Sequence, residues 1–347
     1  MSESYVRPVW RALCAVLEQQ AAADPGAEHG APRPAAPSGN LTLRPPKEES
    51  RGDLCSNILL LASGQEEEVR DRLARTVLAA VEAVPSVRSA EVAPNGYVNI
   101  HLQAGYWLAE IPVILERARA YGMSLLENQG GFELVRPATT DDLVSARQFW
   151  QVEALMKVAD LAGLAYALSP APEDGDRGMA TRTAVAKCSL PRVRFALLAN
   201  GASFARHFSP VRAVDQSYDN PVFAVPYAIS RIRSLLAAAS AGEGGEDPVD
   251  VDYSVLTRSN EQKIAKFMCQ WPLALEQSLR NRDIIHLSAF LHDLSLLFFR
   301  LEREERLVSS EYLTETGTRP ARLGLLSALK LQLCEGLEIL GIEMVEE

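Results

Sequence analysis

The segment that decides the fold reads Phe132-Glu133-Leu134-Val135-Arg136-Pro137-Ala138-Thr139-Thr140-Asp141-Asp142-Leu143-Val144-Ser145-Ala146-Arg147 and continues as a helical run to Ala162-Gly163-Leu164. The pattern is typical of a short strand, a polar turn and a helix. Asp141 and Asp142 stand directly before the helix, where acidic residues commonly cap the first turn. Paired carboxylates for acid–base chemistry are the alternative interpretation. We favour the helix cap.

Length and composition indicate a globular protein with two or three domains. The chain has 347 residues, of which 47% are hydrophobic and 23% are charged, which is ordinary for a globular protein. No apolar run approaches the roughly 20 residues that span a bilayer. The N-terminus lacks the basic and apolar regions of a signal peptide. We therefore expect no membrane association and a cytoplasmic location.

Cysteine and histidine usage predicts neither a disulfide framework nor a metal site. The five cysteines are scattered without a CxxC pair, and the five histidines form no HxxxH pair. This usage favours a reducing compartment. We predict no metal and no cofactor.

The net charge bears on possible partners. At −10, it argues against a general nucleic-acid binder. A negative net charge is nevertheless compatible with a local basic groove.

The region before this segment predicts a small α/β domain over residues 1–122. Asn95-Gly96 between two strand-like runs is a strong hairpin signal. Residues 24–46, rich in Pro, Gly and Ala, predict a linker. The expected helices are Tyr5–Ala23, Glu66–Val84 and Trp107–Tyr121, and the expected strands are Val87–Val92 and Tyr97–Leu102.

The region after the segment is expected to be mainly helical. Residues 166–187 carry only weak signals, and Ala239–Asp250 predicts a surface connector. Apolar residues at three- and four-residue spacing predict a helical bundle over residues 211–347. Its expected helices are Asn220–Ala239, Asn260–Leu279, Asp283–Glu304 and Arg319–Leu340.

One stretch of this helical region carries a family signature. It reads Asn220-Pro221-Val222-Phe223-Ala224-Val225-Pro226-Tyr227-Ala228-Ile229-Ser230-Arg231-Ile232 and resembles the N-P-V-x-Y-V-Q-Y-A-H-A-R-I motif that opens the DALR anticodon-binding domain of arginyl-tRNA synthetases. Pro226 replaces the Gln of the motif and Ile229 replaces its His. Gly336-Leu337-Glu338-Ile339-Leu340-Gly341-Ile342 resembles the family's ending. The resemblance implies an all-α DALR bundle.

Three residues of this region are candidate tRNA contacts, namely Asn220, Tyr227 and Arg231. Asn220 and Pro221 also make a good helix entry. For Tyr227 the alternative is a place in the core. For Arg231 the alternatives are a phosphate contact and a structural ion pair.

The first domain resembles the additional N-terminal domain of the same family. Pro46-Lys47-Glu48-Glu49-Ser50-Arg51-Gly52-Asp53-Leu54-Cys55-Ser56-Asn57 and Ala93-Pro94-Asn95-Gly96-Tyr97-Val98-Asn99-Ile100 carry the likeness. It implies that Tyr97 stacks on a base of the tRNA elbow while Asn99, on the same strand face, hydrogen-bonds to it. The alternative is a packed Tyr97 and an Asn99 that braces the turn.

The segment 132–164 resembles the part of these synthetases that contains the ATP-binding His-x-Gly-His turn. Asp142 and Ser145 take the histidine positions, and Val144 takes that of the glycine. A carboxylate would repel triphosphate, and no KMSKS-like loop follows. Only about 45 residues separate Gly163 from the helical domain, too few for a nucleotide-binding domain. Residues 123–210 are therefore interpreted as a truncated strand–helix remnant of a Rossmann-like catalytic domain.

The expected fold class is α+β, with an α/β N-terminal domain, this remnant and an all-α bundle. The expected function is tRNA binding, with tRNA(Arg) as the preferred ligand, by a protein without catalytic residues. It would present tRNA to a partner such as a tRNA-modifying enzyme or a synthetase, or regulate the use of that tRNA. The alternatives are an RNA-free protein–protein interaction module and, less favoured, a residual arginine–tRNA ligase. The candidate tRNA-binding residues are Tyr97, Asn99, Asn220, Tyr227 and Arg231.

Overall fold

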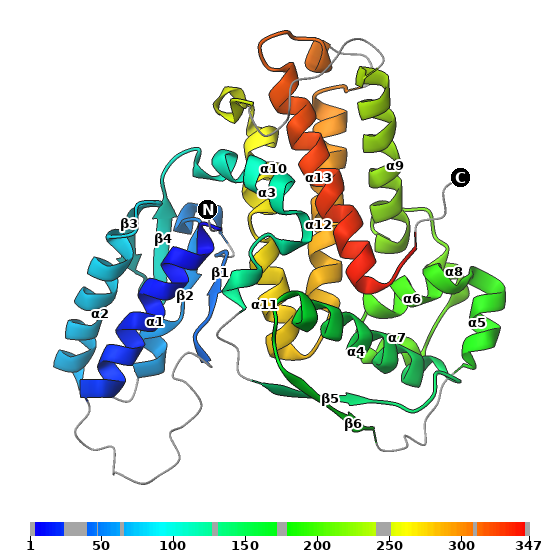
Figure 1. Ribbon diagram of the computed structural model, residues 1–347, viewed down its shortest axis with the longest axis horizontal. Coiled ribbons are helices and arrows are strands. Elements are labelled where there is room, and N and C mark those ends of the chain that lie inside the picture. The colour runs from blue at the N-terminus through cyan, green and yellow to red at the C-terminus, as the bar shows by residue number, and fades with distance from the viewer. Residues whose placement is uncertain are drawn as a thin grey trace. The chain divides into compact units, whose positions relative to one another are not determined.

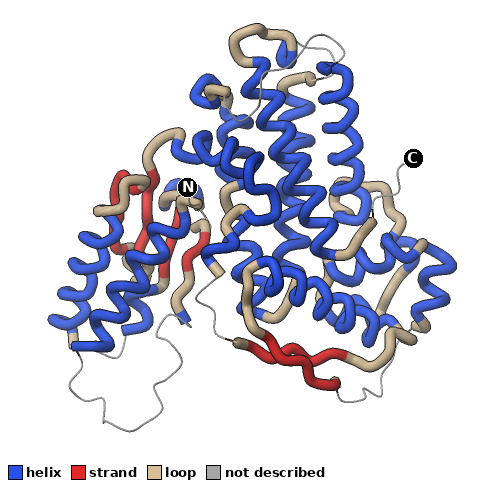
Figure 2. The backbone as a smooth tube through the Cα atoms, in the orientation of Figure 1, coloured by secondary structure: helices blue, strands red, loops and turns tan. Residues whose placement is uncertain are grey.

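A computed structural model describes residues 4–23, 40–46, 48–62, 66–126, 131–171, 179–240, 251–307 and 311–343. Its contacts divide the chain into two compact units, Met1–Tyr106 and Trp107–Glu347. The strands fall into two separate sheets, and the other regular elements are helical (Figure 2). The predicted α+β class is confirmed.

The first unit is an antiparallel sheet with two helices. The strand order is β1 (Leu43–Arg44), β2 (Leu54–Ser56), β4 (Val98–Leu102) and β3 (Val87–Val92). The helices α1 (Val6–Ala23) and α2 (Glu67–Glu82) pack against each other and cover one face of the sheet (Figure 1). Leu73, Val77 and Val81 of α2 recur every fourth residue and are buried, as an amphipathic helix requires. Most of the predicted linker 24–46 lies outside the described residues, but its end forms β1.

The predicted β3–β4 hairpin is present. Val92 pairs with Val98, and the nitrogen of Ala93 donates to the oxygen of Tyr97 at 2.8 Å. Gly96 adopts a φ of 81°, and a Cβ there would lie 2.6 Å from Leu60. The turn therefore needs glycine for both its backbone conformation and its packing.

The second unit contains one β-α-β element. Strand β5 (Phe132–Arg136) leads through α4 (Leu143–Leu161) to β6 (Tyr166–Pro170), which lies parallel to β5. The predicted strand and helix are present, and a second strand that was not predicted follows the helix. The weak signal over residues 166–187 was misleading, because this stretch holds β6 and α5 (Thr181–Cys188). The pairing of β6 with β5 comes from residues some 30 positions away, which local patterning does not register.

The rest of the second unit is helical (Figure 1). Its helices are α3 (Glu110–Arg117), α6 (Leu190–Leu198), α7 (Ala202–Arg206), α8 (Pro210–Ala213), α9 (Pro221–Ser240), α10 (Ser259–Met268), α11 (Trp271–Asn281), α12 (Ile285–Glu304) and α13 (Arg319–Leu340). Helices α9, α12 and α13 pack on one another and contribute many residues to the apolar core. Leu291, Leu294 and Phe298 of α12 are fully buried in this core.

Two predicted helices differ from the structure. The run Asn260–Leu279 is two helices, α10 and α11, because the chain turns at Cys269 and Gln270 and Pro272 occupies the first turn of a new helix. The helix expected over Trp107–Tyr121 is regular only as α3 and is flanked by 3₁₀ turns at Tyr106–Ala109 and Ala118–Ala120.

The division between the two units falls before Trp107 and not after residue 122. Helix α3 belongs to the second unit because it packs on α13. The expected boundary between residues 210 and 211 separates regions that share one compact unit. The division into domains over residues 1–122, 123–210 and 211–347 remains a prediction.

Within the described residues, α9 alone is long and apolar enough to cross a membrane. Of its apolar stretch Pro221–Ala239, 39% is buried. Helix α9 packs against α6, α12 and α13. Ala224, Val225, Ala228 and Ile232 of α9 are buried at these contacts. Core packing therefore accounts for the apolar residues on this face of α9.

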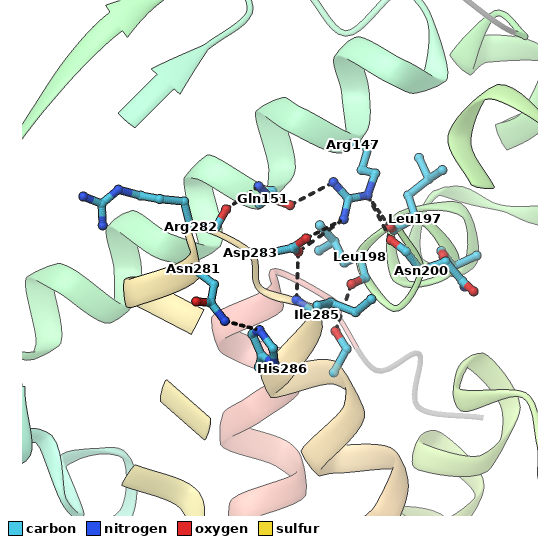
Figure 3. A network of polar contacts seen from close by, with 12 residues as sticks. Arg147, Gln151, Leu197, Leu198, Asn200, Asn281, Arg282, Asp283, Ile285 and His286 are labelled. Carbon is cyan, nitrogen blue, oxygen red and sulfur yellow. Dashed lines mark hydrogen bonds and ion pairs between the residues drawn. The ribbon is translucent and has the colours of Figure 1, made fainter. Parts of the chain in front are cut away.

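Helix α4 is joined to the bundle by a network around Arg147, which is 6% exposed. Its Nε donates to the carbonyl oxygens of Leu197 and Asn200 at 3.1 and 3.0 Å, and its Nη2 donates to Asp283 at 3.2 Å (Figure 3). Gln151 of α4 donates to the oxygen of Arg282 at 2.7 Å. The turn after α6 and the turn before α12 are therefore both held by α4.

Candidate nucleic-acid interface

A hollow of about 730 Å³ lies beside α6 and α9. It is large enough for a small ligand or an unpaired nucleotide. Among its lining residues, the accessible aromatic and basic side chains are Arg192 of α6 and Phe223, Tyr227 and Arg233 of α9, whereas Phe195 of α6 is buried behind them. Aromatic rings and guanidinium groups together are what single-stranded nucleic acid requires.

Two lining residues, Phe223 and Tyr227, belong to an aromatic cluster that extends beyond the hollow to Tyr218 and Phe299. Phe223 and Tyr227 stand one helical turn apart on α9, and their rings stack at 5.1 Å with an interplanar angle of 16°. Tyr218 stacks on Phe299 of α12 at 4.3 Å and remains 48% exposed. An exposed ring braced from behind by other rings is a ready surface for stacking a base.

Two arginines at the hollow have their charges available. Arg192 and Arg233 are both exposed. Among the described residues neither makes an ion pair. Asp215 and Glu343 also line the hollow, so its charge is mixed.

The structure gives Asn220 a local role. Its Oδ1 accepts from the nitrogen of Val222 at 3.2 Å, as a helix cap does. Its Nδ2 donates to the carbonyl oxygens of Arg212 and Asp215 at 3.2 and 2.7 Å. These bonds engage both ends of the amide, so Asn220 fixes the loop before α9.

Arg231 is held by Glu302 of α12. Its Nε and Nη2 donate to one carboxylate oxygen at 3.0 and 2.6 Å. The hydrogen bond to this carboxylate raises the pKa of Arg231 above its ordinary value. Of the two alternatives predicted for Arg231, the geometry therefore matches the structural ion pair.

In the first unit, Tyr97 lies at the end of the hairpin turn and is half-buried. Arg44 lies 5.4 Å from its ring centre and donates to its hydroxyl at 3.0 Å. Asn99 is only 5% exposed, and it pairs with Cys55 and Glu91 on the two neighbouring strands. Tyr97 could therefore stack on a base, whereas burial leaves Asn99 little surface to offer.

The turn before α4 is built as a helix cap, as predicted. Asp142 accepts hydrogen bonds from the nitrogens of Val144 and Ser145, each at 3.0 Å, and from the hydroxyl of Ser145 at 2.9 Å. The nitrogen of Leu143 donates to Met179 at 3.0 Å, and that of Thr181 donates to Asp141 at 2.9 Å. A carboxylate therefore occupies the amide groups that would otherwise attract a phosphate, and a second backbone segment lies against the turn.

The sequence-based interpretation assigned no role to Arg192, Arg233, Tyr218 or Phe223. The four-residue spacing of Phe223 and Tyr227 was a usable signal that both rings lie on one face of a helix. The proximity of Arg192 to this face depends on the packing of α6 against α9, which no local pattern encodes.

Two family models match the chain. The Arginyl tRNA synthetase N terminal domain matches residues 27–102, and the DALR anticodon binding domain matches residues 225–347. The second match contains only part of the lining of the hollow, since the lining residues from Ser189 to Phe223 precede it. The hairpin with Tyr97 lies within the first match. Residues 103–224 lie between the two matches.

Curated relatives are similar over part of their length. An arginine–tRNA ligase of Methylobacterium nodulans is 31% identical over 163 residues, which covers 45% of this chain and 28% of that protein. One of Ruegeria sp. is 32% identical over 161 residues, covering 44% and 28%. The chain thus matches little more than a quarter of the length of these relatives.

Solved structures show the same fold. The arginyl-tRNA synthetase of Thermus thermophilus has a TM-score of 0.58 at 11% identity, covering 98% of this chain and 100% of that chain. The synthetase of Plasmodium falciparum has a TM-score of 0.61 at 8% identity, covering 99% of each. At these identities the likeness concerns the fold alone.

Proposed function

The chain is an arginyl-tRNA synthetase-like protein, and from that premise we propose that it binds tRNA, with tRNA(Arg) preferred, without charging it with arginine. The bound tRNA would be presented to a partner enzyme or withheld from other uses. The protein would act as a tRNA-holding adaptor.

The capping carboxylate of Asp142 carries the non-catalytic half of the proposal. ATP would have to place its phosphates near the amide groups that Asp142 already occupies. Displacing the carboxylate would leave it beside a triphosphate of the same sign, which is costly. The paired backbone at Leu143 and Met179 further restricts the space above the turn.

The hollow supports the RNA-binding half. Unpaired bases can stack on Tyr218, Phe223 or Tyr227, while Arg192 and Arg233 offer two cations for phosphates. The first unit adds the exposed side of Tyr97 with Arg44 against its ring. Two modules that each bind weakly would hold one tRNA more tightly than either alone.

The test is direct binding of purified protein to tRNA transcripts at low salt, followed by fluorescence anisotropy. We expect tRNA(Arg) to bind more tightly than a tRNA of another specificity, and affinity to fall as salt rises because counterions are released. Absence of binding at low salt would refute the proposal. ATP–pyrophosphate exchange with arginine, measured on the same sample, should stay at background. Exchange above background would instead support a residual ligase.

A second candidate is an RNA-free protein interaction module. Its supporting observations are the ion pair that engages Arg231, the burial of Asn99 and the net charge of −10. Affinity purification from the native cells, with and without ribonuclease, separates the two proposals. A stable protein complex that contains no RNA and survives ribonuclease would favour this second candidate.

A further inference from the structure

The segment between the β-α-β element and α9 has an unusual charge composition. Residues 179–214 contain no aspartate or glutamate, although the composition of the chain would place about five there. The same residues include six lysines and arginines in a chain whose net charge is −10. Negative charge has therefore been concentrated elsewhere in the molecule.

The helices of this segment pack around one another. Helix α6 contacts α5, α7 and α8, and α5 also contacts α8 (Figure 1). The thiol of Cys188 donates to the oxygen of Pro210 at 3.7 Å and joins the end of α5 to the start of α8. Cations that are scattered in sequence are thus displayed by one compact group of helices.

Five of the six basic side chains are exposed. We call them the basic surface: Arg182, Lys187, Arg192, Arg206 and Arg212. The sixth, Arg194, is instead 14% exposed and pairs with Glu153 of α4 at 3.1 Å. Arg194 therefore anchors the segment to α4, and the five residues of the basic surface are exposed to solvent.

We propose that the basic surface binds the phosphate backbone of RNA that flanks the nucleotides held in the hollow. The proposal rests on the proposed function and adds the part of the molecule that supplies most of the electrostatic attraction. It also reconciles RNA binding with an acidic chain, because a locally positive face attracts a polyanion despite the opposite net charge.

Continuity with the hollow favours RNA over an acidic protein as the occupant. Arg192 belongs to both, and the hollow that it lines also contains the partly exposed rings of Phe223 and Tyr227. Aromatic stacking would hold the bases while exposed arginines contact the phosphates, a division typical of nucleic-acid interfaces. The absence of acidic residues suits a ligand whose charge repeats along its length.

The test compares two triple variants of equal charge change. The first is Arg182→Gln with Lys187→Gln and Arg212→Gln, which spares the hollow. The control is Arg300→Gln with Arg303→Gln and Arg306→Gln, three exposed arginines in the last turns of α12 and just after it. Both are checked for unchanged thermal unfolding. Binding of a tRNA transcript is then measured between 50 and 200 mM salt.

We expect the first variant to lose at least about tenfold in affinity at the lower salt. Its plot of log affinity against log salt should be shallower by about 2, since each lost phosphate contact removes roughly 0.7–0.9 from the slope. The control should remain within about twofold of the wild type. Equal losses in both variants would overturn the proposal in favour of a general charge effect.

Three further outcomes separate this proposal from the proposed function. If the wild type binds tRNA and the first triple variant binds equally well, the basic surface is not the RNA contact, although tRNA binding stands. If the wild type does not bind tRNA at low salt, both proposals fail. Binding of polyglutamate but not of RNA, with loss in the first variant, would reassign the surface to an acidic protein and overturn the proposal.

Discussion

Arg147 and Asp283 lie 136 positions apart in the chain, yet their side chains form an ion pair at 3.2 Å. Arg147 belongs to the helix of the β-α-β element, and Asp283 lies in the turn that leads into α12. The guanidinium group is buried and also donates to one carbonyl near the end of α6 and one in the turn after it. The truncated α/β part is thereby a structural brace of the helical bundle.

Arg147→Ala should destabilise the second unit by about 3 kcal/mol, because removing one partner of a buried pair leaves its other contacts unsatisfied. Urea denaturation followed by circular dichroism measures the change. Arg182→Ala, at an exposed position of α5, is the matched control and should stay within about 0.5 kcal/mol. Similar losses in both variants would contradict the bracing role.

Restoring the His-x-Gly-His residues should not restore ATP use. Asp142→His with Val144→Gly and Ser145→His removes the cap of α4, at a cost of about 1 kcal/mol. The backbone pairing of Leu143 with Met179 would remain against the turn. We expect no arginine-dependent ATP–pyrophosphate exchange from the folded variant. Measurable exchange would show that the turn residues alone had silenced the site.

Tyr227→Ala should weaken RNA binding by about 1–3 kcal/mol, the amount usual for a lost stacking partner. Tyr227→Phe keeps the ring that stacks on Phe223 and should retain most of the affinity. Anisotropy titrations with one tRNA transcript compare the two variants. Wild-type affinity in the alanine variant would exclude this ring from the interface.

Gly336→Ala should destabilise the bundle by about 1–3 kcal/mol, because α12 and α13 touch there and an added Cβ would collide with Leu291. Gly201→Ala is the control, since no atom lies within 4 Å of the position of its Cβ. Chemical denaturation of both variants gives the comparison. A loss in the control equal to that at Gly336 would contradict the role of the close approach.

Glu276 of α11 gives the stability a dependence on pH. Burial raises the pKa of this carboxyl above its model-compound value of 4.5, although Arg280 acts in the opposite direction. The folded state therefore holds the proton more tightly than the unfolded state, and this group's contribution to stability falls as pH rises through 4.5 and the folded pKa. Gln does not titrate, so the free energy of unfolding of Glu276→Gln should increase relative to that of the wild type as the pH is raised from 4 to 7. Parallel pH profiles from denaturant unfolding would contradict this assignment.

Sequence patterns predicted the elements whose signals are local. The hairpin around Gly96 needed only a turn dipeptide between alternating strands, and α13 needed only its helical spacing. The cap at Asp142 followed from its place before a helix. Strand β6 was missed because its identity depends on a partner strand supplied from elsewhere in the chain.

The candidate site was harder to predict than the fold. Matching residue types drew attention to the stretch around Tyr227, but they could not show that Glu302 engages Arg231. Conversely, Arg192 and Arg233 carry no motif of their own, and their role at the hollow follows from the packing of α6 and α9. Family signatures drew attention to α9, while long-range contacts decide which of its side chains are exposed.

Strand β6 has a consequence for how the protein behaves at high concentration. Among the described strands it pairs only with β5, and Leu168 leaves 44% of its surface exposed. An open strand edge of this kind can recruit strands from other molecules. Pro170, its last residue, has no backbone hydrogen to donate, so an incoming strand would find the ladder interrupted. Pro170 therefore limits how far a strand from another molecule could extend along this edge.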